Sequence, residues 1–191
     1  MSEAGTQQNA DDGAPAAAGR SFVDRFVGAF RLDRSVYEEI ANDPGALAQA
    51  AGVAACAAVA RTVGVSSTGT SGEAVFGAIY VFGFWPVVSV LVWSVGKLLR
   101  NPGEFGPVLR VVGFAMAPLI LVGLLLVPNE WFRGGVLLVT YALLFGALLV
   151  GVRQVLRIDT GRAAFVCIVV AMLYFFLHSI MVYTVLGGGS S

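Results

Sequence analysis

Five long apolar stretches follow one another along this chain, and each is long enough to form a helix that crosses a membrane. A helix needs about 20 predominantly apolar residues to cross a hydrocarbon core of ~30 Å. Short polar segments separate the stretches, so successive helices are expected to run in opposite directions. We therefore predict an all-α fold, a polytopic membrane protein with a five-helix transmembrane bundle in residues 44–186. The expected spans are residues 46–65, 74–96, 111–127, 134–152 and 163–186.

The segments outside the bundle are polar. Residues 1–20 consist mainly of Ala, Gly, Gln and Asp and contain no apolar run, which predicts a disordered cytoplasmic tail and no cleavable signal peptide. In residues 21–43 apolar side chains recur at helical spacing, which predicts short amphipathic helices at the membrane interface. Residues 187–191 are Gly and Ser and are expected to form an external tail.

The first amphipathic helix is predicted from a stripe of phenylalanines. Phe22, Phe26 and Phe30 are spaced four residues apart and share one face. Arg25 is expected on the opposite, polar face. Such a stripe is typical of a helix that seats a bundle on the membrane, and it is also compatible with a helix that senses curvature or docks a partner.

A second short helix is predicted to follow, because Ser35 and Glu38 have the spacing of a capping box. Tyr37 lies on the apolar face of this helix. Asp43 is predicted to be the N-cap of the first span, with Pro44 in its first turn.

The basic residues sort onto one side of the predicted membrane. Cytoplasmic loops of membrane proteins carry an excess of Lys and Arg. With a cytoplasmic N-terminus, ten basic residues lie inside, and only Arg61 and Arg133 lie outside. We therefore expect a multi-pass protein of the cell membrane, with its N-terminus in the cytoplasm and its C-terminus outside. The ten inner residues are Arg20, Arg25, Arg31, Arg34, Lys97, Arg100, Arg110, Arg153, Arg157 and Arg162.

The first span is only marginally hydrophobic, because it is rich in Ala and Gly and carries Gln49. If it lay flat on the membrane, the N-terminal arginines would move outside and the charge bias would vanish, so the charges favour insertion. Small residues allow helices to approach closely, and we expect this span at the centre of the bundle, shielded from lipid. The small residues of this span form two stripes. One stripe is Ala46, Ala50, Ala54 and Ala58, and the other is Ala48, Gly52, Cys56 and Ala60.

Two spans contain a proline. Pro86 and Pro118 should each bend their helix, because proline removes a backbone hydrogen bond. Broken helices can line a transport path, so a small membrane transporter or permease-like subunit is the alternative function. No Asp, Glu or Lys lies inside a span, which leaves no visible site for a coupling ion.

Few residues within the spans could carry chemistry. Arg61 is close enough to the outer end of its helix to reach the interface and is interpreted as a charge that sets topology. His178 is interpreted as a packing residue. Cys56 and Cys167 are expected at different depths and should stay reduced. The chain has no nucleophile motif and no cluster of metal ligands, so we expect no enzyme activity, no cofactor and no metal.

Contacts with lipids or partners are expected on the cytoplasmic side. Acidic residues there could meet a basic partner, and the inner cations attract anionic headgroups. The twelve basic and twelve acidic residues give no net charge, so binding of nucleic acid is not expected. The expected partners are membrane lipids, other membrane proteins or a second copy of the chain. The candidate contact residues are Phe22, Phe26, Phe30, Tyr37, Glu38, Glu39, Arg100, Arg110, Arg153 and Arg157.

Three segments of the chain resemble the Yip family of membrane proteins, and in particular its prokaryotic, especially archaeal, members. The first is LDRSVYEEIANDPGALAQA, which includes the second amphipathic helix. The others are FGPVLRVVGFAMAPLILVGLL, which runs into the third span, and GVRQVLRIDTGRAA, which precedes the last span. The likeness extends over residues 22–185.

The resemblance implies five spans, a cytoplasmic N-terminus and no catalytic residues. Eukaryotic members of the family act in vesicle trafficking and bind prenylated Rab-type GTPases and one another. This chain lacks their longer N-terminal region with its Asp-Leu-Tyr-Gly-Pro-like motif, so direct binding of a GTPase is not expected. The expected function is that of a non-enzymatic membrane-organising or partner-binding scaffold.

Overall fold

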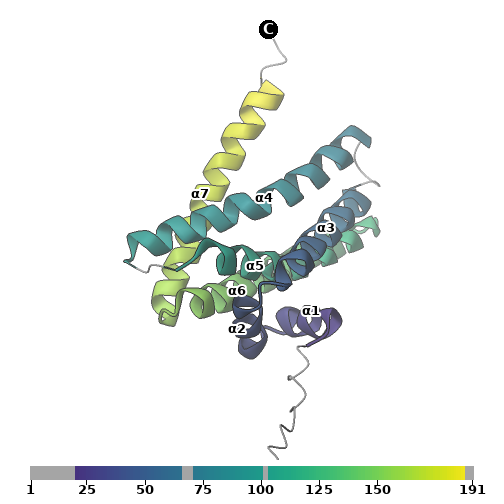
Figure 1. Cartoon of the computed structure of the whole chain (residues 1–191). Coiled ribbons are helices and arrows are strands. Elements are labelled where there is room, and N and C mark those ends of the chain that lie inside the picture. Colours follow the sequence, from purple (N-terminus) through teal and green to yellow (C-terminus); the bar gives the residue numbers. More distant parts are fainter. Residues whose placement is uncertain (1–19, 66–70, 101–102, 188–191) are drawn as a thin grey trace, which may run out of the picture.

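The described part of the chain is a bundle of helices (Figure 1). The computed structural model describes residues 20–65, 71–100 and 103–187, and the predicted tails lie outside it up to residue 19 and beyond residue 187. Every regular element within these ranges is helical, which confirms the all-α fold. The elements are α1 (Phe22–Phe30), α2 (Arg34–Asn42), α3 (Ala46–Val65), α4 (Ser71–Leu98), α5 (Phe105–Ala115), the 3-10 helix η1 (Ala117–Leu126), α6 (Glu130–Leu156) and α7 (Thr160–Gly187).

Five segments of the described chain are long and apolar enough to cross a membrane, which confirms the polytopic architecture. They lie in α3, in α4, in α5 together with η1, in α6 and in α7. The short helices α1 and α2 lie beside the bundle near the start of α3 (Figure 1). The five segments are Ala46–Gly64, Gly77–Leu98, Phe105–Leu126, Glu130–Leu156 and Thr160–Leu177.

The third helical span begins earlier than predicted, at Phe105 rather than at residue 111. The sequence Gly106-Pro107 is typical of a turn, but here it lies in the first turn of α5. Proline is tolerated at this place because the first backbone N–H groups of a helix have no partner within the helix.

The centre of the bundle is the third span, and the prediction that the first span lies there is wrong. In the most apolar part of each span, 67% of the third span is buried but only 33% of the first. The first span, α3, packs against α4, α5 and η1, and Ala60 of the second stripe of small residues is buried with the first stripe. Ala46, Ala50, Ala54 and Ala58 are buried, whereas Ala48 and Cys56 of the other stripe are exposed.

The two intramembrane prolines differ in effect. The α-helix of the third span ends at Ala115, and the chain continues as the 3-10 helix η1, whose first turn contains Pro118. This agrees with the loss of a backbone hydrogen bond at proline. A 3-10 segment of ten residues is long for this type of helix. By contrast, α4 continues as a helix through Pro86.

Candidate functional site

The candidate site is the N-terminal cap, which we define as helices α1 and α2. It contains six of the ten residues predicted to contact lipids or partners. Helix α1 begins after Ser21, whose hydroxyl oxygen accepts a hydrogen bond from the Asp24 N–H at 3.2 Å. The chain leaves α1 through Leu32, which has a left-handed backbone conformation with φ of 62°. This turn allows α2 to fold back against α1.

The capping box predicted at Ser35 and Glu38 is wrong. The N-cap of α2 is Asp33, two residues before Ser35, and the helix begins at Arg34. The Asp33 carboxylate accepts hydrogen bonds from the Ser35 N–H at 2.9 Å and from the Ser35 hydroxyl at 2.8 Å. A carboxylate at the N-terminus of a helix also interacts favourably with the helix dipole. Glu38 is exposed on the outer face of α2.

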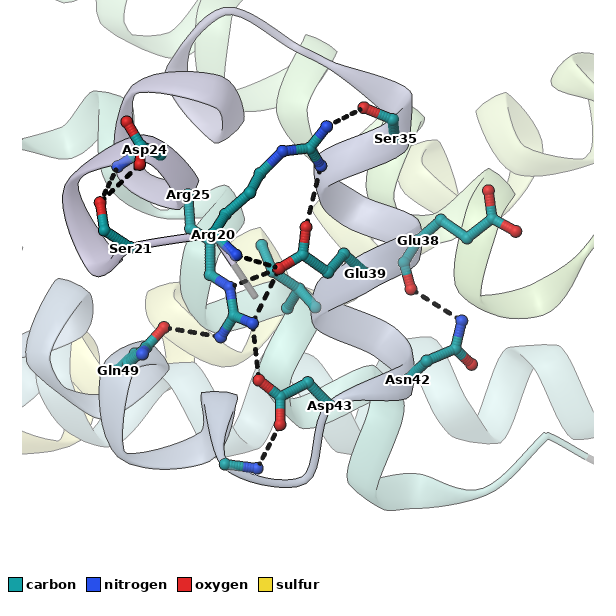
Figure 2. Close-up of polar contacts among 12 residues, drawn as sticks. Arg20, Ser21, Asp24, Arg25, Ser35, Glu38, Glu39, Asn42, Asp43 and Gln49 are labelled. Carbon is teal, nitrogen blue, oxygen red and sulfur yellow. Dashed lines mark hydrogen bonds and ion pairs between the residues drawn. The ribbon is translucent and has the colours of Figure 1, made fainter. Parts of the chain in front are cut away.

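Arg25 points into the protein, so its predicted place on a polar outer face is also wrong. The residue is only 4% exposed. Its guanidinium donates to Glu39 Oε1 from Nε at 3.0 Å and from Nη2 at 2.8 Å, and Nη1 donates to Gln49 Oε1 at 3.0 Å (Figure 2). Nη2 also lies 2.7 Å from Asp43 Oδ2. The planar guanidinium, with five N–H donors, can satisfy several acceptors at once.

These contacts form a polar cluster that connects α1 with the end of α2 and the start of α3 (Figure 2). We call it the Arg25 cluster and define it as Arg20, Arg25, Glu39, Asp43 and Gln49. Arg20 completes it by donating from Nη1 to Glu39 Oε2 at 2.9 Å. A buried charge is tolerated when it is paired and hydrogen-bonded, and this condition is met for Arg25.

Asp43 acts in a turn rather than as the N-cap that the sequence predicts for the first span. One carboxylate oxygen pairs with Arg25, and the other accepts a hydrogen bond from the Gly45 N–H at 2.8 Å. Helix α3 begins after this turn, at Ala46. The carboxylate therefore connects the turn between α2 and α3 to α1.

The electrostatics of the cluster favour charged carboxylates. The hydrogen bond from Arg25 lowers the pKa of Asp43. Partial burial opposes ionisation of Glu39, but hydrogen bonds and charge attraction from Arg25 and Arg20 outweigh it, so the pKa of Glu39 is also lowered. Both groups are thus ionised at neutral pH and hold the Arg25 guanidinium.

A second contact between the N-terminal cap and the bundle comes from Arg110 of α5. Its guanidinium donates to the backbone carbonyl oxygens of Ile40 at 3.2 Å and of Ala41 at 2.5 Å. These carbonyls belong to the last turn of α2, where a helix has unsatisfied acceptors and favours a positive charge. Arg110, a predicted contact for lipids or partners, therefore binds the end of α2.

Tyr37 is buried, and the prediction that it contacts a partner or lipid is wrong. Its side chain has no exposed surface, and its hydroxyl donates to the Ala29 carbonyl oxygen at 3.1 Å. Burial raises the pKa of the phenol, which keeps it a hydrogen-bond donor. Tyr37 packs close to Gly151 of α6 and thus connects both cap helices to the bundle.

We expect Tyr37→Phe to lower the free energy of unfolding by about 1 kcal/mol, the usual net contribution of one hydrogen bond. The effect stays moderate because the Ala29 carbonyl also accepts from the Leu32 N–H at 3.1 Å. Thermal unfolding in detergent measures it, with the exposed Tyr141→Phe as the control. An unchanged unfolding temperature in both variants would show that the buried hydroxyl does not stabilise the cap.

The remaining predicted contact residues are distributed over two surfaces. Phe22 of α1 is exposed, although its ring centroid lies 6.4 Å from that of Phe114 in α5. Phe26 and Phe30 are partly buried against the core. The cationic positions lie at the ends of the long helices, with Arg100 and Arg157 exposed and Arg153 half-buried.

The sequence pattern did not reveal the Arg25 cluster as a unit. Helical spacing placed Arg25 on the polar face of α1, and Gln49 was only a polar residue in a weakly apolar first span. The position of Gln49 could have indicated the cluster, because a polar side chain in the first turn of a span needs a hydrogen-bond partner. Within the described residues, no group of three or more His, Cys, Asp or Glu side chains is arranged to hold a metal ion.

Comparison of the chain with known proteins assigns it to a protein family. A search of curated proteins and a search of solved structures returned no match. Residues 28–181 match the Yip1 domain, a range that includes all five spans. The match confirms the resemblance carried by the three sequence segments. The chain therefore belongs to the Yip1 domain family and is a multi-pass membrane protein.

Proposed function

We propose that this protein is a non-enzymatic scaffold of the cell membrane that organises the membrane or binds other membrane proteins through its N-terminal cap. The observation that carries the proposal is the way the cap is held. Its inward polar groups, Arg25, Glu39 and Tyr37, bind other parts of the same chain. They serve the structure and leave the outer face of the cap available for a partner.

That outer face has a defined composition. Arg34, Glu38 and Asn42 follow one another at four-residue spacing along α2, and all three are exposed. Four-residue spacing places them on one side of the helix. The face carries both signs of charge on a helix whose position is set by the Arg25 cluster and by Arg110. A pre-ordered surface of this kind lowers the entropy lost on binding.

A partner at this face should be captured by a photo-crosslinking amino acid placed at Glu38 in cells. We expect a discrete adduct, whose mass distinguishes a second copy of the chain from another membrane protein. The control is Leu138, an exposed apolar residue in the span formed by α6, which should give no discrete adduct. Equal crosslinking at both positions, or none at Glu38, would argue against the scaffold.

The proposed orientation has the N-terminus in the cytoplasm, as the distribution of basic residues favours. In a background without Cys56 and Cys167, cysteines introduced at Pro15 and Asp159 should be protected from a membrane-impermeant thiol reagent added outside. Cysteines at Ser67 and Ser190 should react. Labelling of the Pro15 position from outside would contradict the proposed orientation.

The transporter alternative is favoured by one observation, a cavity of about 350 Å³ that is lined by residues from all five spans. The described residues that line this cavity include no Asp or Glu, and therefore no carboxylate that could couple transport to an ion. Reconstituted liposomes separate the two functions. A transporter would show substrate-dependent flux that His178→Leu abolishes, whereas a scaffold would show no flux.

A further inference from the structure

The cavity in the bundle has an apolar body. It lies between α4, α6 and α7 and reaches the third span, and its volume of about 350 Å³ is within the range of ligand sites in proteins. Most of its lining is aliphatic or aromatic. The residues that form the apolar body include Val81, Phe84, Val88, Leu144, Leu148 and Val170.

Polar groups gather at one end of this cavity. They are Arg61 of α3 and the three tyrosines Tyr80, Tyr141 and Tyr174. The Tyr80 hydroxyl donates to the Tyr174 hydroxyl at 3.1 Å. Among the described residues, the buried Nε of Arg61 has no hydrogen-bond partner. A buried donor without an acceptor is costly, so this group needs an acceptor that the described residues do not provide.

The backbone of α4 makes room for this arginine. A Cβ atom on Gly77 would lie only 3.2 Å from Arg61 Nε, which is a crowded contact. With a larger residue at this position, the guanidinium would have to shift by a few tenths of an ångström. The absence of a side chain at Gly77 therefore lets Arg61 lie along α4 at the polar end of the cavity.

The charge of Arg61 and its position in the membrane indicate which class of ligand fits the cavity. Arg61 is positive and no acidic residue is among the described lining residues, so the polar end is complementary to an anion. Arg61 is three residues from the end of its span at Gly64, or ~5 Å at 1.5 Å per residue. The guanidinium is thus near the level of lipid headgroups, and its planar donors match a phosphate.

The length of the apolar body agrees with an acyl chain. It extends along α4 from Tyr80 to Val92, twelve residues apart, which corresponds to ~18 Å. One leaflet of a ~30 Å hydrocarbon core is ~15 Å thick. We propose that the cavity binds one anionic phospholipid, with its phosphate at Arg61 and an acyl chain in the apolar body. The proposal does not depend on the partner-binding function.

Native mass spectrometry of the full chain tests this inference directly. Incubated with equal amounts of phosphatidylglycerol and phosphatidylcholine of the same chain length, the protein should retain one phosphatidylglycerol. Arg61→Gln should reduce this retention about tenfold, because a charged hydrogen-bond donor is lost. Arg133→Gln is the matched control, since Arg133 is also near the predicted outer surface but does not line the cavity, and it should retain the lipid. Equal retention by wild type and Arg61→Gln, or equal binding of phosphatidylcholine, would overturn the proposal.

A second readout does not require a substitution at Arg61. Cys167 lines the cavity, whereas Cys56 is exposed. In a Cys56→Ser variant, phosphatidylglycerol should slow the reaction of Cys167 with N-ethylmaleimide, and inorganic phosphate at millimolar concentration should not. Ala171→Phe, which narrows the cavity from an exposed position on α7, should remove the effect of the lipid. Protection by phosphate alone, or lipid protection that persists in Ala171→Phe, would rule out the acyl-chain site.

Discussion

Replacing Arg25 by Leu is expected to release the N-terminal cap from the bundle and to lower the free energy of unfolding by about 2 kcal/mol or more. Removing one partner of a buried ion pair typically costs 3–5 kcal/mol, because the other charge remains without a partner. Here the cost is lower, since the side chains of Glu39 and Asp43 are still 25% and 36% exposed and can be hydrated.

Hydrogen exchange and thermal unfolding in detergent measure this effect. Backbone amides of α1 should lose protection in Arg25→Leu, while those of α5 and α6 remain protected. The matched control is Arg31→Leu, an exposed arginine just after α1, which should change stability by less than ~0.5 kcal/mol. Equal effects of the two substitutions would show that the buried pairing of Arg25 does not hold the cap.

The same pairing makes the cap sensitive to acid. The pKa values of Glu39 and Asp43 are lowered in the folded protein, so their contribution to stability is complete above the ordinary values of 4.5 and 3.8. It is lost as the pH falls through the lowered pKa values of the folded state. Protection of α1 should therefore decrease below about pH 4 in the wild type. Arg25→Leu should show much less of this dependence.

Gly113→Val is expected to destabilise the transmembrane bundle, with a loss of about 3 kcal/mol. A Cβ atom at this position would lie 2.7 Å from the Cβ atom of Ala50 and 2.9 Å from Trp85 Nε1. Both distances are shorter than a normal contact, so α3 or the indole must move. Trp85 donates a hydrogen bond to the Leu109 carbonyl oxygen at 2.7 Å, and a displaced indole would lose it. Overpacking of a core alone costs ~1–3 kcal/mol.

The control for this substitution is Gly52→Ala. No atom outside its own helix turn lies within 4 Å of a Cβ placed at Gly52, so alanine fits there and should raise stability by up to ~1 kcal/mol.

A double variant tests the contact between α3 and α5. Ala50→Gly combined with Gly113→Ala should recover part of the loss seen for Gly113→Ala alone, because Ala50→Gly removes the clash with the Ala50 Cβ atom and leaves only the one with Trp85. If Gly113→Val leaves the unfolding temperature unchanged, the close approach of α3 and α5 is not required for stability.

The class of protein and its spans could be predicted because a bilayer limits the possible structures. A chain that crosses hydrocarbon must satisfy its backbone polar groups internally, so each long apolar stretch had to be helical. The sequence predicted a bend at both intramembrane prolines, because proline removes a backbone donor; the α-helix ends near Pro118 but continues through Pro86, so local sequence does not decide the effect of each proline. The family match over residues 28–181 agrees with this local information.

The direction in which each residue of the N-terminal cap points could not be predicted in this way. In a soluble amphipathic helix a charge faces water, but Arg25 has three polar partners inside the protein, supplied by α2, the following turn and α3. Tyr37 is buried because α1 and α6 pack around it. These partners are distant in sequence, and periodicity within one helix does not reveal them.

The amino-acid sequence by itself therefore determined the helical spans, the membrane location and the presence of two short amphipathic helices. Each of these follows from interactions within one segment or between one segment and its solvent. Only the tertiary structure decided that the third span is central, that Arg25 and Tyr37 are internal and that Arg61 lies at the end of a cavity. Those features depend on which helices meet and at which faces, and small residues such as Gly113 set how closely they meet.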